Sequence, residues 1–293
     1  MSRDAACAQP PILDDLQSAL GHLSELGQSV IAPVASSIRT TTLLFAAAHG
    51  WPVVNHNRFA DWAAPNDGNN TRWLLLDPLC SQARFGTGAV RARLTRVATP
   101  QGLRVDGDLP KDASAVVHGS DVVVLDDVVA SGTTLCEAVH LVEHAGGRVA
   151  RFIVCAARPA GRSAALSAAP DAEWFSYTTG GFETVHLRDA CPFVPFASRP
   201  VWNRRSIPTD NGSVGVSMPV TAFRGGLWGQ LAIDSRLGHT IMAGKREIAQ
   251  RFSTALGRPA IVADVPLLGT NVMLPLKPSQ TADANSKLEE LMR

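Results

Sequence analysis

Residues 121–135, Asp-Val-Val-Val-Leu-Asp-Asp-Val-Val-Ala-Ser-Gly-Thr-Thr-Leu, decide the fold of this 293-residue chain. The unbroken Val and Leu run from Val122 to Leu125 predicts a strand that is covered on both faces. The strand is expected to end in two carboxylates, Asp126 and Asp127, and a small hydroxyl-rich turn follows at 130–134. The apolar periodicity after this turn indicates that it opens a helix.

This turn offers a phosphate site next to a pair of acids. Backbone N–H groups and the positive end of the helix dipole favour an anion. Gly132 lets the backbone approach a ligand closely. Hydroxyl donors are added by Ser131, Thr133 and Thr134. Because ionised carboxylates accept hydrogen bonds from sugar hydroxyls, the stretch predicts a ligand with both a phosphate and vicinal hydroxyls.

Val122 to Thr134 resembles the signature of the type I phosphoribosyltransferase family, and it matches every place of that motif. An acidic strand end also occurs in flavodoxin-like receiver domains, but the Ser-Gly-Thr-Thr turn is foreign to them. The resemblance implies an α/β fold: a central, mostly parallel sheet flanked by helices, with a flexible lid hairpin and an acceptor-binding hood. It also implies that the motif binds 5-phosphoribosyl-1-pyrophosphate (PRPP). In the family the turn, here Ala130, Ser131, Gly132, Thr133 and Thr134, holds the 5′-phosphate.

The reaction implied by the resemblance is transfer of the 5-phosphoribosyl group to a nitrogenous acceptor, with release of pyrophosphate. Asp126 and Asp127 would hold the ribose hydroxyls, directly or through Mg²⁺. Ala130 stands where hypoxanthine- and guanine-type enzymes carry Asp, which disfavours a 6-oxopurine acceptor. A non-catalytic PRPP- or nucleotide-binding regulator of the same fold is the alternative, because an intact motif is compatible with both.

Pyrophosphate ligands are expected at two places. Residues 29–34 predict a short strand, and in the family the turn after the first strand touches the pyrophosphate, which points to Ser36, Ser37 and Arg39. An ordinary strand-to-helix connection explains the same residues equally well. Residues 80–112 occupy the place of the lid, in which 90–97 and 103–109 predict an antiparallel hairpin and basic residues such as Arg84 would meet the pyrophosphate.

The hood of the family binds the acceptor, partly through segments after the last core strand. This position makes Phe182, His186, Asp189 and Phe193 the acceptor candidates. A turn-rich stretch at 198–215 predicts a boundary between a phosphoribosyltransferase-like domain, 1–204, and a C-terminal α+β extension or small second domain of unknown role, 205–293.

The remaining elements follow from periodicity. Helices are expected at 12–27, 40–49, 135–145, 160–169, 228–236, 240–256 and 285–292, strands at 73–76, 148–157, 174–178 and 259–265, and a loop at 55–72.

Composition narrows the class of protein. Apolar residues make up 45% of the chain, enough for a core, and the net charge of +1 gives no support for nucleic-acid binding. Five scattered cysteines without a CxxC pair indicate reduced thiols rather than a disulfide or zinc framework. No secretory signal or membrane segment is expected, so the sequence predicts a cytoplasmic protein with small-molecule partners. The family resemblance also allows a homodimer.

Overall fold

The computed structural model describes residues 11–23, 25–64, 72–99, 102–178, 185–191, 194, 206–209, 212–215, 227–228, 231–232 and 235–258. The chain forms two compact units. The first unit comprises Met1–Pro11 and Val54–Thr184, and the second unit comprises Ile12–Val53 and Val185–Arg293. This packing differs from the predicted division into 1–204 and 205–293, because the segment 12–53 packs with residues that follow 184.

The first unit is built on a five-stranded sheet with the order β4-β3-β7-β8-β9, and every neighbouring pair is parallel. This arrangement confirms the predicted α/β class with a mostly parallel central sheet. The strands are β4 (Ala89–Arg91), β3 (Arg72–Leu75), β7 (Asp121–Val129), β8 (Arg148–Ala157) and β9 (Glu173–Ser176).

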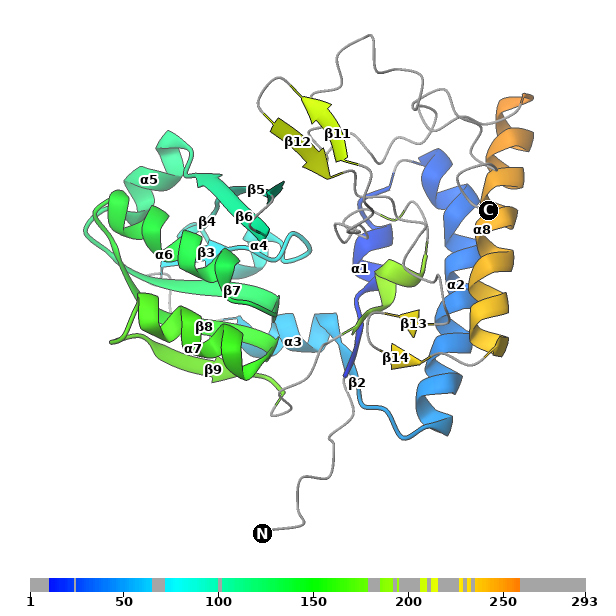
Figure 1. Cartoon of the computed structure of the whole chain (residues 1–293), viewed down its shortest axis with the longest axis horizontal. Helices are drawn as coiled ribbons and strands as arrows, with labels where there is room; N and C mark the ends of the chain where they lie inside the picture. Colours follow the sequence, from blue (N-terminus) through cyan, green and yellow to red (C-terminus); the bar gives the residue numbers. More distant parts are fainter. Residues whose placement is uncertain are drawn as a thin grey trace. The chain divides into compact units, whose positions relative to one another are not determined.

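One row of apolar residues crosses all five strands in register. The row consists of Val90, Leu74, Val124, Phe152 and Trp174. The first four belong to the buried core of this unit, which also takes in apolar residues of the neighbouring helices, and the partly buried Trp174 packs against it. Those helices are α5 (Lys111–Val117), α6 (Thr133–His144) and α7 (Pro159–Ala168). Figure 1 shows α6 and α7 lying along the sheet, as the central β7 and β8 require for burial.

Several predicted elements of this unit are confirmed. The strand at 148–157, the helix after the motif and the antiparallel hairpin of β5 (Arg93–Thr99) and β6 (Gly102–Asp108) are all present. The loop predicted at 55–72 is wrong for its first half, where α3 (His56–Ala63) forms. The short helix α4 (Gln82–Phe85) precedes β4.

The second unit is dominated by two long helices, α2 (Glu25–Ala48) and α8 (Ser235–Leu256). They pack closely, since a Cβ on Gly244 would lie 2.9 Å from side-chain atoms of Val34 and Ile38. Beside them β1 (Ile12–Asp14) pairs in parallel with β10 (Val185–His186). The other elements are α1 (Leu16–Leu20), β2 (Val53–Asn55), η1 (Leu187–Ala190) and two hairpins, β11 (Ser206–Thr209) with β12 (Gly212–Gly215) and β13 (Leu227–Trp228) with β14 (Leu231–Ala232).

The predicted strand at 29–34 is wrong, because this segment is the first part of α2. The apolar run before Pro33 suggested a strand, but the buried positions of α2 recur at helical spacing. They are Gly27, Val30, Ile31, Val34, Ala35, Ile38, Thr42, Phe45 and Ala46. Their burial offsets the backbone hydrogen bond that Pro33 lacks.

Three further expectations in this unit have different outcomes. The helix predicted at 12–27 is replaced by β1, α1 and the start of α2. The helix predicted at 228–236 is wrong, because β13 and β14 form a small hairpin there, whereas the helix at 240–256 is confirmed within α8. The strand at 259–265 and the helix at 285–292 lie outside the described residues.

Among the described helices, α2 alone has the length and apolar composition that a membrane span needs. It is 44% buried inside the protein over its most apolar window, and core helices of soluble proteins pass the same test. The absence of a membrane segment stays a prediction.

Candidate functional site

The candidate site lies at the carboxyl ends of the parallel strands in the first unit. Parallel strands present these ends at one edge, and ligands of open α/β sheets bind there. The segment that begins with Asp77 follows β3, the 130–132 turn follows β7, Arg158 follows β8 and Tyr177 follows β9. Four segments far apart in the sequence therefore meet at this edge.

Helix α3 crosses the same edge from one side to the other. Its first residue, His56, places Nε2 2.7 Å from Oδ2 of Asp77, after β3. Its other end meets Tyr177, after β9, through edge-to-face contacts of Phe59 and Trp62 with ring centroids 6.0 and 5.2 Å apart. An eight-residue helix is about 12 Å long, and three strand spacings are about 14 Å. Since β7 and β8 lie between β3 and β9, α3 bridges the ends of the strands that carry the motif (Figure 1).

The acidic pair lies within β7 rather than after it. The predicted strand, Val122 to Leu125, continues to Val129, and Asp126 pairs with Val154 of β8. Both carboxylates are nearly buried, at 5% and 7% exposure. Asp126 Oδ1 accepts a hydrogen bond from the N–H of Asp127 at 3.0 Å, and Asp127 Oδ1 accepts one from the N–H of Val128 at 2.6 Å. One oxygen of each carboxylate is thus fixed by the backbone.

The turn after β7 has the geometry that the sequence predicted. Gly132 has φ +83°, and a Cβ there would lie 2.6 Å from the carbonyl oxygen of Gly161 in α7. Ser131 Oγ and Thr133 Oγ1 are 2.9 Å apart, and α6 begins at Thr133. Of the remaining positions, Ala130 is exposed and Thr134 is half-buried. Small residues and hydroxyls therefore surround the N-terminus of α6, although no ligand tests their binding roles.

Side chains of Asp77 and Arg91 hold the loop after β3 by hydrogen bonds to its backbone. Asp77 Oδ1 accepts a hydrogen bond from the N–H of Leu79 at 2.9 Å. The guanidinium of Arg91 donates to the carbonyl oxygens of Asp77 at 3.0 Å, Pro78 at 3.4 Å and Cys80. Arg91 lies in the predicted lid segment, 80–112, but its side chain supports the backbone of this loop.

The predicted turn that carries three of the pyrophosphate candidates is a helix in the structure. Ser36, Ser37 and Arg39 lie inside α2, in the second unit, so their N–H groups belong to a helix and no turn is present. Arg39 makes a bidentate ion pair with Asp14, Nε to Oδ1 at 2.9 Å and Nη2 to Oδ2 at 2.6 Å. The fourth candidate, Arg84, lies in α4 of the first unit, 3.4 Å from Asp61.

Of the four acceptor candidates, the structure describes only His186 and the backbone of Asp189. His186 lies in the second unit, where its buried ring places Nδ1 2.7 Å from Oδ2 of Asp15. Asp189 lies in η1, and its side chain is outside the described part of the chain. Phe182 and Phe193 fall outside the described residues.

Sequence reasoning missed the contribution of α3. The signal was present, because Phe59, Ala60 and Ala63 are buried at helical spacing while Trp62 keeps 45% exposure. The polar residues that follow in 66–70 hid this pattern. Tyr177 was likewise missed, because its contact with α3 depends on which strands are neighbours.

Comparisons with known proteins found one family model and several similar solved structures. Residues 84–175 match the model of the phosphoribosyl transferase domain family. Two similar solved structures are adenine phosphoribosyltransferases. One is the Saccharomyces cerevisiae protein complexed with an imino-altritol bisphosphate and adenine, with 18% identity and a TM-score of 0.30 over 42% of this chain and 74% of that chain. The other has 18% identity and a TM-score of 0.28 over 42% of this chain and 75% of that chain. No curated protein matches this sequence.

Proposed function

We propose that the protein transfers the 5-phosphoribosyl group of PRPP to a nitrogenous acceptor and releases pyrophosphate, on the premise that residues 84–175 match the phosphoribosyl transferase domain family. One observation supports this proposal above all. The nearly buried acidic pair in β7 lies directly before the glycine turn at which α6 begins. The two carboxylates can accept hydrogen bonds from vicinal hydroxyls, and the turn can bind a phosphate of the same ligand.

The turn at 130–134 binds the 5′-phosphate in this proposal. The N-terminal N–H groups of α6 and the hydroxyls of Ser131 and Thr133 supply donors. Gly132 gives the turn its shape, since its αL backbone and its close contact with Gly161 of α7 exclude a side chain. The phosphate end of the donor is thereby anchored before the ribose is positioned.

Asp126 and Asp127 suit a magnesium ion as well as the ribose hydroxyls. Mg²⁺ prefers oxygen ligands and commonly uses one or two carboxylates together with substrate phosphates. The backbone hydrogen bonds to both carboxylates fix their orientation without neutralising their charge. When bound, the ion would neutralise charge on the departing pyrophosphate. The two carboxylates themselves orient the ribose, so that C1 faces the acceptor.

The pyrophosphate is assigned to the segment after β3 in place of the turn that was expected at 35–39. In the family the turn after the first core strand touches the pyrophosphate, and β3 is the first strand of the parallel sheet in this unit. Ser81, the N-cap of α4, and Arg84, within α4, are polar residues of this segment. Arg84 has an exposed fraction of 34%, so its charge can reach a ligand.

The acceptor is assigned to the aromatic end of α3. Trp62 is large, 45% exposed and in contact with Tyr177. A flat heteroaromatic ring stacks well on such a surface, and α3 brings Trp62 to the same edge of the sheet as the acids. In this proposal the chain chiefly positions both reactants, since displacement of pyrophosphate at C1 needs little covalent help from it.

A calorimetric titration of PRPP with Mg²⁺ tests the donor site. Wild type is expected to bind, whereas Asp126→Asn with Asp127→Asn is expected to lose binding. Asp121→Asn is the matched control, because Asp121 lies in the same strand but at its other end, in an exposed pair with Arg148. A folded wild type that does not bind PRPP would refute the proposal. Binding without pyrophosphate release across an acceptor series would favour the regulator. A cytoplasmic location and a homodimer stay predictions.

A further inference from the structure

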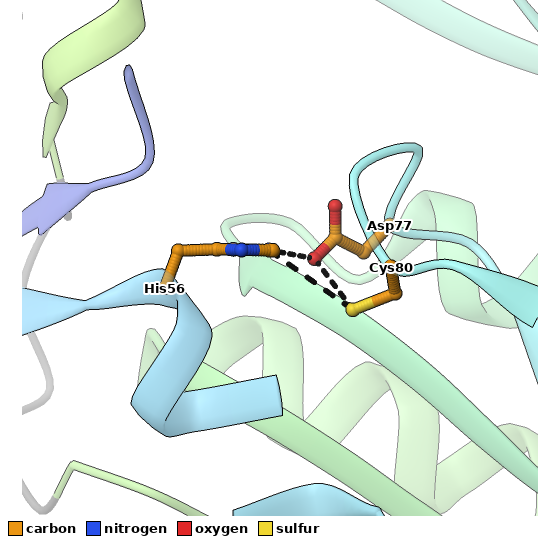
Figure 2. Close-up of side chains that lie close together, drawn as sticks. All are labelled: His56, Asp77 and Cys80. Atoms are coloured by element: carbon orange, nitrogen blue, oxygen red, sulfur yellow. Dashed lines mark hydrogen bonds and ion pairs between the residues drawn. The ribbon is translucent and has the colours of Figure 1, made fainter. Parts of the chain in front are cut away.

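Three side chains that the proposed transfer does not use converge beside the phosphoribosyl site. They are His56 from the first turn of α3, and Asp77 and Cys80 from the loop after β3. Figure 2 shows the imidazole of His56 and the sulfur of Cys80 both directed at one oxygen of Asp77. All three residues are buried, with 1%, 0% and 1% exposure.

The three donor atoms span a volume suited to one cation. His56 Nε2 is 2.7 Å from Asp77 Oδ2, Cys80 Sγ is 3.2 Å from the same oxygen, and Sγ is 4.0 Å from Nε2. Two ligands of a tetrahedral zinc ion lie roughly 3.3–3.8 Å apart, given bonds of about 2.0–2.3 Å. Two of the measured separations are shorter than that range and one is longer, so the three side chains would shift by a few tenths of an ångström when the ion binds. One nitrogen, one oxygen and one sulfur also form a donor set that zinc accepts.

The surrounding contacts hold these donors in place. Asp77 Oδ1 accepts a hydrogen bond from the N–H of Leu79. This bond fixes the carboxylate so that Oδ2 faces His56 and Cys80. Arg91 fixes the carbonyl groups of Asp77 and Cys80, and so the backbone that carries two of the three donors. His56 is fixed by α3, whose N-cap Asn55 accepts a hydrogen bond from the N–H of Arg58. Such supporting contacts are typical of preorganised metal sites.

We propose that His56, Asp77 and Cys80 bind a zinc-class divalent cation, with water or a ligand oxygen as the fourth ligand. The cation would tie the start of α3 to the loop after β3, and so fix two of the segments that surround the donor site. The arrangement differs from that of a cysteine nucleophile. The thiol of Cys80 donates its hydrogen bond to Asp77 and lies 4.0 Å from the imidazole, so the histidine is not placed to activate it.

The site is separate from the magnesium site of the proposed transfer. Asp127 is close enough for its negative charge to raise the pKa of Cys80, after the larger effects of burial and of Asp77. The two sites are therefore neighbours with different ligands: carboxylates only for magnesium, and a mixed nitrogen, oxygen and sulfur set for zinc. Because their chemistry differs, each can be tested without the other.

Cobalt titration of the full-length, chelator-treated protein tests the proposal, in the absence of PRPP. Wild type is expected to bind one Co²⁺ with a thiolate-to-cobalt charge-transfer band and the intense visible bands of four-coordinate cobalt, and zinc should displace both. Cys80→Ala and His56→Gln are each expected to weaken binding at least tenfold, and Cys80→Ala should abolish the charge-transfer band. Cys136→Ala and Cys155→Ala, which each remove a thiol of the same unit, are the matched controls and should keep it.

Two results would overturn the proposal. One is a folded wild type without a charge-transfer band, which means that the three side chains form only a hydrogen-bonded network. The other is a cobalt signal that persists in Cys80→Ala but disappears in Asp126→Asn with Asp127→Asn, which assigns the cation to the acidic pair. The wild-type spectrum reports sulfur ligation directly, so a Cys80→Ala variant that fails to fold leaves the test intact. Loss of PRPP binding alone would instead count against the proposed transfer.

Discussion

Gly132 and Gly161 both lack room for a side chain, because the turn after β7 packs closely against α7. A Cβ on Gly132 would lie 2.6 Å from the carbonyl oxygen of Gly161, and a Cβ on Gly161 would lie 2.6 Å from the carbonyl oxygen of Ala130. This close approach ties the turn after β7 to the first turn of α7. The shape of the proposed phosphate site therefore depends on two glycines 29 positions apart in the sequence.

Gly132→Ala is expected to weaken PRPP binding and to destabilise the protein. The αL backbone costs roughly 1–2 kcal/mol for a non-glycine residue, and the contact with Gly161 adds a steric penalty. Gly119→Ala is the matched control, because Gly119 has φ +65° but nothing within 4 Å of the added Cβ. Calorimetry with PRPP and thermal unfolding separate the two variants. Equal losses for both would show that backbone strain alone matters.

Arg91→Met is expected to loosen the loop after β3 and to weaken pyrophosphate binding about tenfold. Hydrogen bonds from a charged donor contribute about 1.5–3 kcal/mol, and this side chain supports three carbonyl groups. Arg148→Met, which breaks only an exposed pair with Asp121, should leave binding unchanged. A calorimetric titration with pyrophosphate measures the difference. Unchanged affinity in Arg91→Met would contradict a pyrophosphate role for this loop.

Trp62→Ala is expected to raise the KM for a ring acceptor roughly tenfold or more, since stacking on an aromatic side chain is worth about 1–3 kcal/mol. PRPP affinity should stay the same, because the phosphate turn and the acids are untouched. Phe175→Ala is the control, with a similar exposed fraction of 42% against 45% and a place in β9. The measurement is pyrophosphate release against acceptor concentration. An effect of equal size in the control would remove the specific role of Trp62.

Asp15→Asn is expected to destabilise the second unit at pH 7 by about 3 kcal/mol, the usual cost of removing one partner of a buried ion pair. Asp15 is fully buried and accepts hydrogen bonds from His186 Nδ1 at 2.7 Å and the N–H of Arg188 at 2.9 Å. Burial alone would raise the pKa of Asp15, but Arg188 and His186 outweigh it and hold the pKa below its ordinary value of 3.8.

The pH dependence of this contribution has a definite sign. Since the folded pKa lies below 3.8, the stabilisation is complete above that pH and is lost as the pH falls through the folded value. Thermal unfolding between pH 7 and pH 3 should show a smaller acid-induced decrease in Asp15→Asn than in wild type. A parallel decrease in both proteins would rule out Asp15 as the titrating group.

The sequence determined the central motif on its own. The strand without alternation, the two acids and the hydroxyl-rich glycine turn predicted β7, the turn at Gly132 and α6, although β7 continues through the acids to Val129. The strands β3, β8 and β9 and the β5–β6 hairpin were also predictable, because their periodicities lie within single elements, whereas β4 was not predicted as a separate strand.

Tertiary structure decided which segments lie side by side, because no single segment of sequence specifies its neighbours in a sheet. Residues 29–39 read locally as strand and turn around Pro33, but burial of a helical face against α8 makes them part of α2. Trp62 and Tyr177 meet only because α3 crosses the strand ends, and His56 meets Asp77 and Cys80 for the same reason. The motif was fixed by local chemistry, and its neighbours were fixed by strand order and by the burial of apolar faces.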